Sequence, residues 1–312
     1  MKILIAYDGS QGADDALDDL PRAGLPPLAE ALIVSVAEVF APPTGLAEAA
    51  GPVQVPPAVR QAWAEATQAV VAARARVLQA RARVQALVPG WQVGAEASAD
   101  SPAWGVIKQA DTWYPDLIVV GSHGRSALGR LVLGSVSQTI VTEARCSVRV
   151  ARRHDRARAG AAPVRLVIGV DGSPNAKAAV DAMAARVWPP GSAVYVVAVL
   201  DARLSTALAP TPPLLEEWVG ASPVDMQEWV HHMVETLGQP LQAVGLAVSS
   251  DVKEGDPKRV LPEIADQWEA DCLVVGARGL SRMQRFLLGS VSAAVAARAH
   301  CSVEVIRLPY RP

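Results

Sequence analysis

Short apolar runs alternate along this chain with longer segments in which apolar residues recur every three or four positions. The first run, residues 2–7, stops at Asp8-Gly9-Ser10, and a matching run, residues 165–170, stops at Asp171-Gly172-Ser173. An apolar run of this length without alternation is typical of a strand covered on both faces, and therefore of a parallel sheet. Each Asp-Gly-Ser predicts the turn into a helix, with the serine as its N-cap.

The two halves of the chain show the same order of elements. In the first half we predict strands at 2–7, 31–36, 92–97, 117–120 and 146–150, and helices at 11–20, at 58–88, after Pro102 and after Gly134. In the second half the predicted strands are 165–170, 193–199, 247–252, 273–275 and 301–305, with helices between them at matching places. Segments 41–57 and 209–223 are rich in proline and glycine and predict long loops. The repeated alternation predicts an α/β fold with a parallel sheet and helices on both faces.

The helix predicted at 58–88 carries one continuous apolar stripe. The stripe consists of Trp63, Val70, Val77 and Val84, with Ala66, Ala73, Ala80 and Leu87 between them. A coiled coil would show this spacing too, but a helix that packs on a sheet is the interpretation we favour. Four arginines lie off the stripe and are interpreted as the solvated face: Arg74, Arg76, Arg81 and Arg83. A shorter stripe in the second half, Met226, Trp229, Met233 and Leu237, is interpreted as core.

One stretch occurs twice with identical glycine spacing. Gly121, Gly124 and Gly134 correspond to Gly276, Gly279 and Gly289, at an offset of 155 residues (276 − 121 = 155). In that register, residues 116–150 and 271–305 are identical at 17 of 35 positions. The earlier elements follow a larger offset of 163 (171 − 8 = 163), so the first half carries 8 more residues (163 − 155 = 8) between Val36 and Pro102.

A buried strand that ends in glycine and leads to a helix start of glycine and serine has the makings of a phosphate-binding loop. Glycine lets a ligand approach the backbone, and a helix N-terminus offers unpaired N–H groups and a partial positive charge to an anion. Serine hydroxyls at these helix starts would add donors: Ser135, Ser137, Ser290 and Ser292. The alternative interpretation is that the glycines only make turns and the serines only cap helices.

Asp8 and Asp171 end the first strand of each half, whereas the glycine stretches end the fourth strand. In a doubly wound sheet, ligands bind beyond the carboxyl ends of the strands at the point where the winding reverses. Each half would therefore bring one carboxylate and one phosphate loop to the same crevice. A carboxylate there would accept a hydrogen bond from a ribose hydroxyl or an adenine amino group. The alternative role for each aspartate is that of a turn residue.

Two further side chains lie in or beside the glycine stretches. His123 stands in the first loop, but Arg278 takes its place in the second, so we expect it to contact the edge of a ligand instead of serving as an acid or base. Arg130 and Arg285 occupy matching positions. They either reach a phosphate or are surface residues. Cys146 and Cys301 precede the last strands and are interpreted as small core residues.

The composition of the chain limits the class of protein to which it can belong. A chain of 312 residues with 51% hydrophobic and 19% charged residues predicts about two globular domains. A net charge of −2 predicts no general attraction to nucleic acid. Three cysteines without metal or disulfide spacing favour a reducing compartment, and no apolar run reaches the ~18 residues of a membrane span. We therefore expect a cytoplasmic protein.

Taken together, the glycine pattern after an apolar strand and the early Asp-Gly-Ser turn resemble the universal stress protein family. The resemblance covers the chain as two tandem domains, residues 1–153 and 164–312, joined by a linker at 154–163. It implies two doubly wound domains, each a five-stranded parallel sheet in the order 3-2-1-4-5. It also implies that the last strands of the two domains, 146–150 and 301–305, pair within the chain, and it leaves a homodimer open.

The resemblance further implies that both domains bind ATP, with Mg²⁺ held through the phosphates. The residues that would bind nucleotide are Asp8, Val36, Gly121, Ser122, His123, Gly124, Arg130, Gly134, Ser135, Val136 and Ser137 in the first half, and Asp171, Val199, Gly276, Ala277, Arg278, Gly279, Arg285, Gly289, Ser290, Val291 and Ser292 in the second. We expect a stress-response protein that acts through nucleotide-dependent conformation or through a protein partner that the sequence does not identify. The alternatives are a slow ATPase, or a related adenine-nucleotide enzyme, and an adaptor whose loops stay empty.

Overall fold

The structure, a computed structural model, describes residues 1–39, 56–124, 133–153, 162–201, 223–279 and 288–308, with backbone only at 223–227. Nearly all of both predicted loops, 41–57 and 209–223, and most of the predicted linker at 154–163 lie outside the described residues, and Pro57 and Pro223 begin helices.

The elements of the first half are found close to their predicted positions. The strands are β1 (Lys2–Ala6), β2 (Glu30–Ala37), β3 (Gln92–Ala99), β4 (Leu117–Gly121) and β5 (Ser147–Ala151). The helices are α1 (Gln11–Asp19), the short 3-10 helix η1 (Leu20–Arg22), α3 (Pro57–Leu87), α4 (Pro102–Trp113) and α5 (Ser135–Glu143). The apolar runs became strands because both of their faces are covered, as the lack of alternation predicted.

The second half repeats this order. Its strands are β6 (Arg165–Val170), β7 (Ala193–Leu200), β8 (Ala247–Glu254), β9 (Cys272–Gly276) and β10 (Ser302–Ile306). Its helices are α6 (Pro174–Ala184), α7 (Pro223–Ala243), α8 (Pro257–Gln267) and α9 (Ser290–Arg298).

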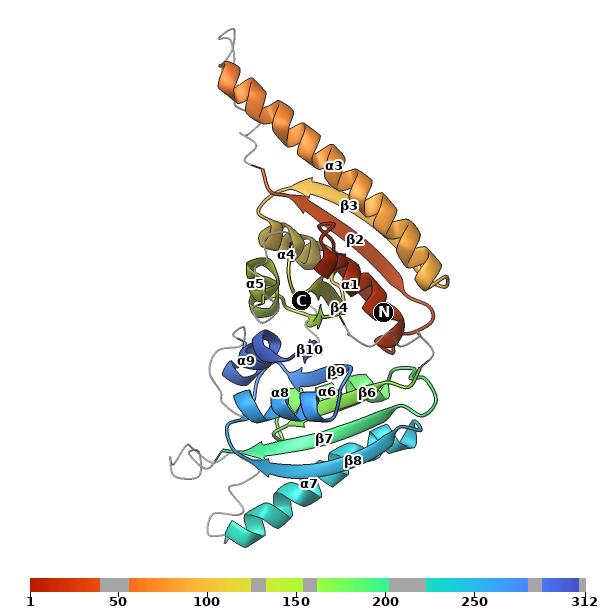
Figure 1. Ribbon diagram of the computed structural model, residues 1–312, viewed down its shortest axis with the longest axis vertical. Coiled ribbons are helices and arrows are strands. Elements are labelled where there is room, and N and C mark those ends of the chain that lie inside the picture. Colours follow the sequence, from red (N-terminus) through yellow and green to blue (C-terminus); the bar gives the residue numbers. More distant parts are fainter. Residues whose placement is uncertain (40–55, 125–132, 154–161, 202–222, 280–287, 309–312) are drawn as a thin grey trace.

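The ten strands form one sheet in the order β3-β2-β1-β4-β5-β10-β9-β6-β7-β8 (Figure 1). Each half is parallel and has the order 3-2-1-4-5 that the resemblance implied. The halves meet where β5 and β10 pair in the antiparallel direction, with Arg149 opposite Glu304. The predicted pairing of the last strands is therefore present, with both strands beginning one residue later than predicted.

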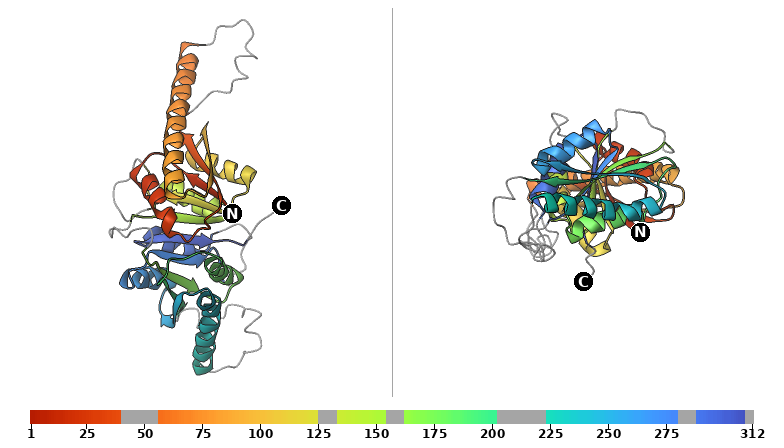
Figure 2. Two further views of the ribbon diagram at one scale, coloured as in Figure 1. Left: turned by 90° about the vertical axis from the view of Figure 1, so that its right-hand side faces the viewer. Right: turned by 90° about the horizontal axis from the view of Figure 1, so that it is seen from below.

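Helices cover both faces of the sheet, and alternate residues of each strand enter different cores (Figures 1 and 2). In β1, Ile3 and Ile5 pack with the residues of α1 and α3, whereas Leu4 joins the core beneath α4 and α5. The core beneath α4 and α5 continues across the junction to α8 and α9, so the two halves share it. On the other face each half has a core of its own.

The long helix α3 confirms the predicted stripe in its C-terminal part, where Ala73, Val77, Ala80 and Val84 are buried. Its N-terminal part extends beyond the sheet (Figure 2), which leaves Trp63 only half-buried. Two of the four off-stripe arginines, which were interpreted as a solvated face, are partly exposed but also contact the turn after β1 or helix α1. The Arg83 guanidinium pairs with Asp14 and Asp18 of α1 at 2.7 Å, and Arg76 packs on the turn after β1.

The second stripe and the cysteines were also interpreted as core. Trp229, Met233 and Leu237 pack against the core of the second half, and Met226 lies where side chains are not described. Cys301 is buried and Cys146 is half-buried against the shared core. Burial raises the pKa of both thiols to about 12, so neither supplies a reactive thiolate at neutral pH.

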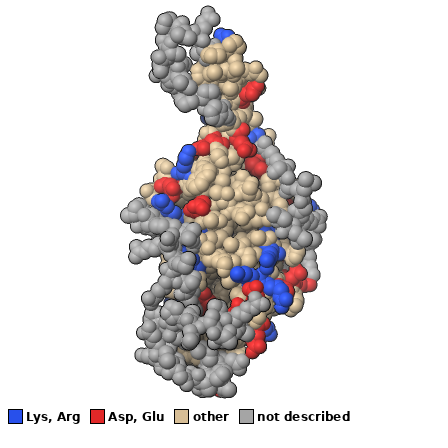
Figure 3. Space-filling model, turned by 90° about the vertical axis from the view of Figure 1, so that its left-hand side faces the viewer, with Lys and Arg blue, Asp and Glu red and all other residues tan. Residues whose placement is uncertain are grey.

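The charges on the surface and the apolar content of the helices were compared with what nucleic acid and a membrane would require. On the face drawn in Figure 3, basic and acidic side chains are interspersed, so this face has no extended field of one sign. Within the described segments, no helix is both long and apolar enough to cross a bilayer.

Candidate functional site

The turn after β1 presents Asp8 at the carboxyl end of the sheet. The Oδ1 atom of Asp8 accepts a hydrogen bond from the backbone N–H of Ser10 at 2.9 Å, and Gly9 between them has φ +78°. Ser10 then caps α1, because its Oγ accepts from the N–H of Ala13 at 3.2 Å. Only glycine adopts that φ without strain, so Asp-Gly-Ser is a local requirement for this turn.

The second half builds the same turn. Asp171 accepts from the N–H of Ser173 at 3.0 Å, Gly172 has φ +76°, and Ser173 caps α6 through the N–H of Ala176 at 3.2 Å. Both capping serines also donate a hydrogen bond across to the glycine stretch. Ser10 reaches the carbonyl of His123 at 3.3 Å, and Ser173 reaches that of Arg278 at 3.2 Å.

The aspartate and the glycine stretch meet because β1 and β4 are parallel neighbours. A Cβ added to Gly124 would stand 3.1 Å from Oδ2 of Asp8, and a Cβ on Gly279 only 2.4 Å from Oδ2 of Asp171. The tertiary structure therefore brings one carboxylate against one glycine loop in each half, as the crevice argument predicted.

One backbone hydrogen bond closes each glycine stretch into a loop. The N–H of Gly134 donates to the carbonyl of Ser122 at 2.8 Å, and that of Gly289 to the carbonyl of Ala277 at 2.8 Å. Gly134 and Gly289 are the N-caps of α5 and α9, and neither helix start has a side-chain cap. The first turns of α5 and α9, which begin at Ser135 and Ser290, therefore start beside the same glycine loops that the aspartates approach, and we call this place the opening.

The four glycines at the ends of the stretches have two different roles. A Cβ on Gly121 would stand 2.3 Å from the carbonyl oxygen of Gly12, and one on Gly276 2.7 Å from the carbonyl carbon of Asn175. These two glycines let α1 and α6 pack on the sheet. A Cβ on Gly134, by contrast, would meet nothing closer than 3.4 Å, and the φ of −60° at Gly134 suits any residue. Gly289 is similar but tighter, with 3.1 Å to the carbonyl oxygen of Ala277. The fold requires Gly121, whereas nothing in the described structure requires Gly134.

The serines at the helix starts also have two different roles. Ser137 donates its hydroxyl proton to the carbonyl of Gly121 at 2.6 Å, and Ser292 donates to that of Gly276 at 2.7 Å. A hydroxyl has a single proton, so in this structure these two serines tie the helix to the strand and have no donor left for a phosphate. Ser135 and Ser290 are exposed at the opening.

His123 is the side chain of the first loop with an unusual environment. Its Nδ1 lies 2.9 Å from Oγ of Ser122, while its Nε2 is buried without a hydrogen-bond partner among the described residues. A buried polar atom without a partner costs free energy, so the position favours a ligand that would supply one.

The remaining predicted residues are less directly placed. The side chains of Val36 and Val199 are partly buried against the shared core, which leaves only their backbone at the carboxyl edge. Beyond Val36, the ends of β2 and β3 form a hollow of about 250 Å³ lined by Glu38, Val39, Asp100 and Ser101. Val136 is exposed and Val291 half-exposed on the first turns of α5 and α9. Arg130 and Arg285 lie outside the described residues.

Sequence reasoning missed the residues that cover the aspartate turn. In the first half, Cδ of Arg76 would lie 2.8 Å from a Cβ on Gly9, whereas in the second half Sδ of Met233 would lie 2.9 Å from a Cβ on Gly172. The two turns thus have a cationic cover in one half and an apolar cover in the other. Since both residues come from the long helices, nothing in the sequence near Asp8 or Asp171 indicates them.

A second group beside the first site was also missed. The hydroxyl of Tyr7 donates to Oδ1 of Asp14 at 2.9 Å, the atom that Arg83 also contacts. Burial and then the hydrogen bond to Asp14 raise the pKa of Tyr7 to about 12, so this residue stays protonated. Val170 stands at the Tyr7 position in the second half, so this group has no counterpart there.

Comparison with known proteins agrees with the repeated fold. A universal stress protein of Mycolicibacterium smegmatis is 30% identical over 213 residues, which are 61% of this chain and 61% of that protein. The first curated relatives are matched over 38% to 61% of their own lengths.

Solved structures show the same fold. A universal stress protein from Archaeoglobus fulgidus aligns over 99% of this chain and 96% of its own, with a TM-score of 0.60 and 18% identity. A universal stress protein family protein from Arabidopsis thaliana, solved with AMP bound, aligns over 46% of this chain and 91% of its own, with a TM-score of 0.30 and 22% identity. A likeness as distant as the latter carries no conclusion about a ligand of this chain.

The model of the universal stress protein family matches twice, at residues 1–152 and at residues 164–307. Because these matches span nearly the whole chain and coincide with its two halves, the protein belongs to the universal stress protein family.

Proposed function

We propose that each half of this chain binds one adenine nucleotide, with ATP as the natural ligand, at the opening between the aspartate turn and the glycine loop. The observation that carries the proposal is the backbone at Gly134, where the described structure itself does not require a glycine. The position is extended backbone and would accept a Cβ at ordinary contact distance, so its glycine is best explained by a ligand that approaches the backbone.

The other groups at the opening suit the parts of such a ligand. The N–H groups at the starts of α5 and α9, with the exposed hydroxyls of Ser135 and Ser290, would hold phosphate oxygens. Asp8 and Asp171 would accept hydrogen bonds from the sugar or the base. Within the described residues, no group of three His, Cys, Asp or Glu side chains could hold a metal ion. We propose that Mg²⁺ accompanies the nucleotide and is held through the phosphates, because Mg²⁺ keeps several waters and binds with few protein ligands at nucleotide sites.

Titration of the full chain with ATP tests this proposal. We expect isothermal titration calorimetry to show two sites per chain, and of unequal affinity because Arg76 covers one turn and Met233 the other. Doubling the ionic strength should weaken the Arg76 half more, since its extra attraction is electrostatic. Folded protein that takes up no ATP would refute the proposal, and two identical sites would refute the role of the arginine.

We further propose that the protein acts through occupancy of these sites and not through turnover. The groups described at the phosphate end are N–H and hydroxyl donors, which bind charge without activating water. His123 is the exception, because its Nε2 is buried and without a partner among the described residues, and it favours slow hydrolysis as the second candidate function.

Turnover of ATP distinguishes the two. We expect His123→Ala to change the rate of hydrolysis by less than about threefold, and the rate itself to stay far below the ~1–100 s⁻¹ of kinases. Phosphate release from saturating ATP measures it, with Arg278→Ala as the matched variant in the second half. A kinase-like rate that His123→Ala abolishes would establish an enzyme instead.

A further inference from the structure

The junction between the halves is built around one pair of opposite charges on the axis that relates them. In the antiparallel pairing of β5 with β10, Arg149 lies opposite Glu304, and Val148 and Val150 lie opposite Val305 and Val303. Arg149 and Glu304 are also equivalent positions of the repeat, since 304 − 149 = 155. Each of the two therefore faces its own counterpart, as it would in a symmetric pair of identical domains.

Both residues of this pair are removed from water. Arg149 is 1% exposed and Glu304 is 0% exposed, and Nη1 of Arg149 lies 3.0 Å from Oε2 of Glu304. If two first halves paired through the same edge, Arg149 would face a second Arg149. Two second halves would bring Glu304 against Glu304. Such a junction would lose the Arg149–Glu304 pair and place two like charges side by side in a buried site, each with only the partner from its own half, Asp19 or Arg186.

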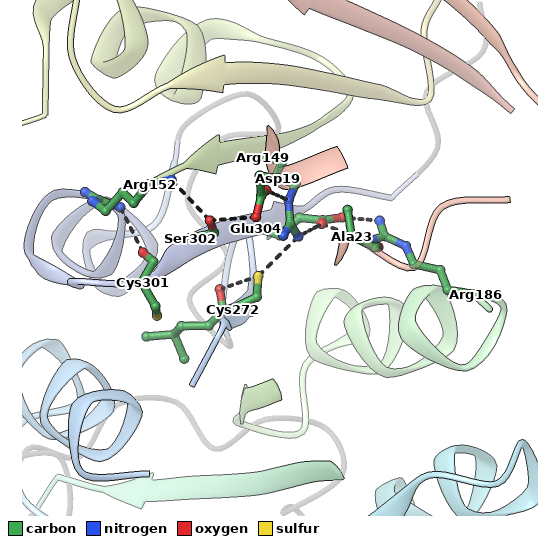
Figure 4. Close-up of polar contacts among 10 residues, drawn as sticks. Asp19, Ala23, Arg149, Arg152, Arg186, Cys272, Cys301, Ser302 and Glu304 are labelled. Carbon is green, nitrogen blue, oxygen red and sulfur yellow. Dashed lines mark hydrogen bonds and ion pairs between the residues drawn. The ribbon is translucent and has the colours of Figure 1, made fainter. Parts of the chain in front are cut away.

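Other charges at the junction are one-sided in the same way (Figure 4). Asp19 holds Nε of Arg149 at 2.5 Å, and Arg186 pairs with Glu304 and donates to the carbonyl of Ala23 at 2.9 Å. At the repeat offset of 163, the counterpart of Asp19 is Ala182 and that of Arg186 is Ala23. Arg22 of the first half pairs with Asp271 of the second half at 3.0 Å, and the counterpart of Arg22 is Ala185. The Asp19–Arg149 and Arg186–Glu304 pairs each lie within one half and would persist in any combination, and in a junction of two first halves Arg22 would meet Asp116, the counterpart of Asp271. A junction between identical halves therefore loses the direct Arg149–Glu304 pair and, for two second halves, the Arg22–Asp271 pair as well.

Several other contacts of the junction are symmetric. Arg152 donates to the carbonyl of Ala296 at 2.6 Å, and its repeat counterpart Arg307 donates to the carbonyl of Val141 at 2.5 Å. Ser302 accepts from the N–H of Arg152 at 3.1 Å, just as Ser147 accepts from that of Arg307 at 3.1 Å. These contacts, with the valines, would stabilise any combination of halves and cannot select one.

We propose that the buried charges are a pairing code, by which the β5 edge of a first half accepts only the β10 edge of a second half, from its own chain or from another copy. The symmetric contacts supply affinity, and the central charges reject the two like-with-like combinations. The chain thereby closes on itself and is kept from polymerising through this edge.

Charge reversal in the full chain tests the code. Arg149→Glu places Glu against Glu304, and Glu304→Arg places Arg against Arg149. Each variant alone should lose about 10 °C in Tm, because a buried pair becomes a repulsion. Glu304→Arg keeps an intact first half, and Arg149→Glu keeps an intact second half. When the two variants are mixed, these two intact halves can pair with all the native charges. The mixture should therefore form a particle with the mass of two chains, measured by light scattering after size exclusion.

Matched variants of the symmetric contacts are the control. Arg152→Met and Arg307→Met each remove one guanidinium from the junction without adding a like charge, so each should keep the wild-type mass, alone and mixed. Reversal variants that keep the wild-type Tm would overturn the code, as would a homodimer of either reversal variant. If the single reversal variants do not fold alone, the two are refolded together. A folded two-chain particle then supports the code, and failure to form one overturns it.

Discussion

Gly134→Ala is expected to weaken ATP binding in the first half by about 100-fold, or about 2.7 kcal/mol, while the protein stays folded. Among the described residues the added Cβ meets nothing closer than 3.4 Å, and we expect it to intrude on the space that we assign to the phosphates. Alanine is a poorer N-cap than glycine, but it also lowers the entropy of the unfolded chain, and these two effects nearly cancel. Calorimetry should show one ATP site in place of two. The free energy of unfolding, measured with urea, should stay within about 0.5 kcal/mol of the wild-type value.

Two other glycines are the controls for this result. Gly289→Ala should remove the second site and spare the first. Gly121→Ala should instead destabilise the fold, because its Cβ would stand 2.3 Å from the carbonyl oxygen of Gly12 and force α1 away from β4. We expect that variant to lose about 1–3 kcal/mol of unfolding free energy. Equal loss of both ATP sites in Gly134→Ala would show that the sites are not independent.

Glu304→Ala is expected to lose about 3–5 kcal/mol of unfolding free energy, the largest effect on stability that we predict. It leaves Arg149 and Arg186 as buried cations with Asp19 as the nearby carboxylate of Arg149. Urea unfolding at pH 7 measures the loss. Glu269→Ala is the matched control, because the Arg165–Glu269 pair spans 3.4 Å at the surface and should contribute at most about 1 kcal/mol. A loss of that small size in Glu304→Ala would show that the buried network does not hold the halves together.

The same carboxylate should make stability sensitive to acid. Burial alone would raise the pKa of Glu304, but Arg186 and Arg149 outweigh it and lower the pKa below its ordinary value. Its contribution is therefore fully present above the pKa of an unfolded glutamate and is lost as the pH falls below about 4 toward the lowered value. Wild type should lose more stability than Glu304→Gln over that range, and parallel curves for the two proteins would contradict this.

The hydrophobic periodicity of the chain was sufficient to predict the helices and strands and much of their order along the chain. Unbroken apolar runs such as 165–170 can only be covered strands, and Asp-Gly-Ser can form its turn without help from distant residues. The exact repeat of glycine spacing likewise placed Asp8 and Gly124 at one edge, because parallel neighbours end on the same side.

What the sequence could not decide was which polar residues face water and which face another part of the chain. In the last strands, Ser147-Val148-Arg149-Val150 alternates like a strand with one solvated face, yet its arginine is buried by the second half. The spacing of Gly121 and Gly134 does not tell a packing glycine from one that leaves room for a ligand, nor does the spacing of Ser135 and Ser137 tell a free hydroxyl from a bonded one. These distinctions depend on tertiary contacts, from Ser137 with Gly121 at a separation of 16 to Arg149 with Asp19 at a separation of 130. Local patterns carry no information about such contacts, so only the tertiary structure settles them.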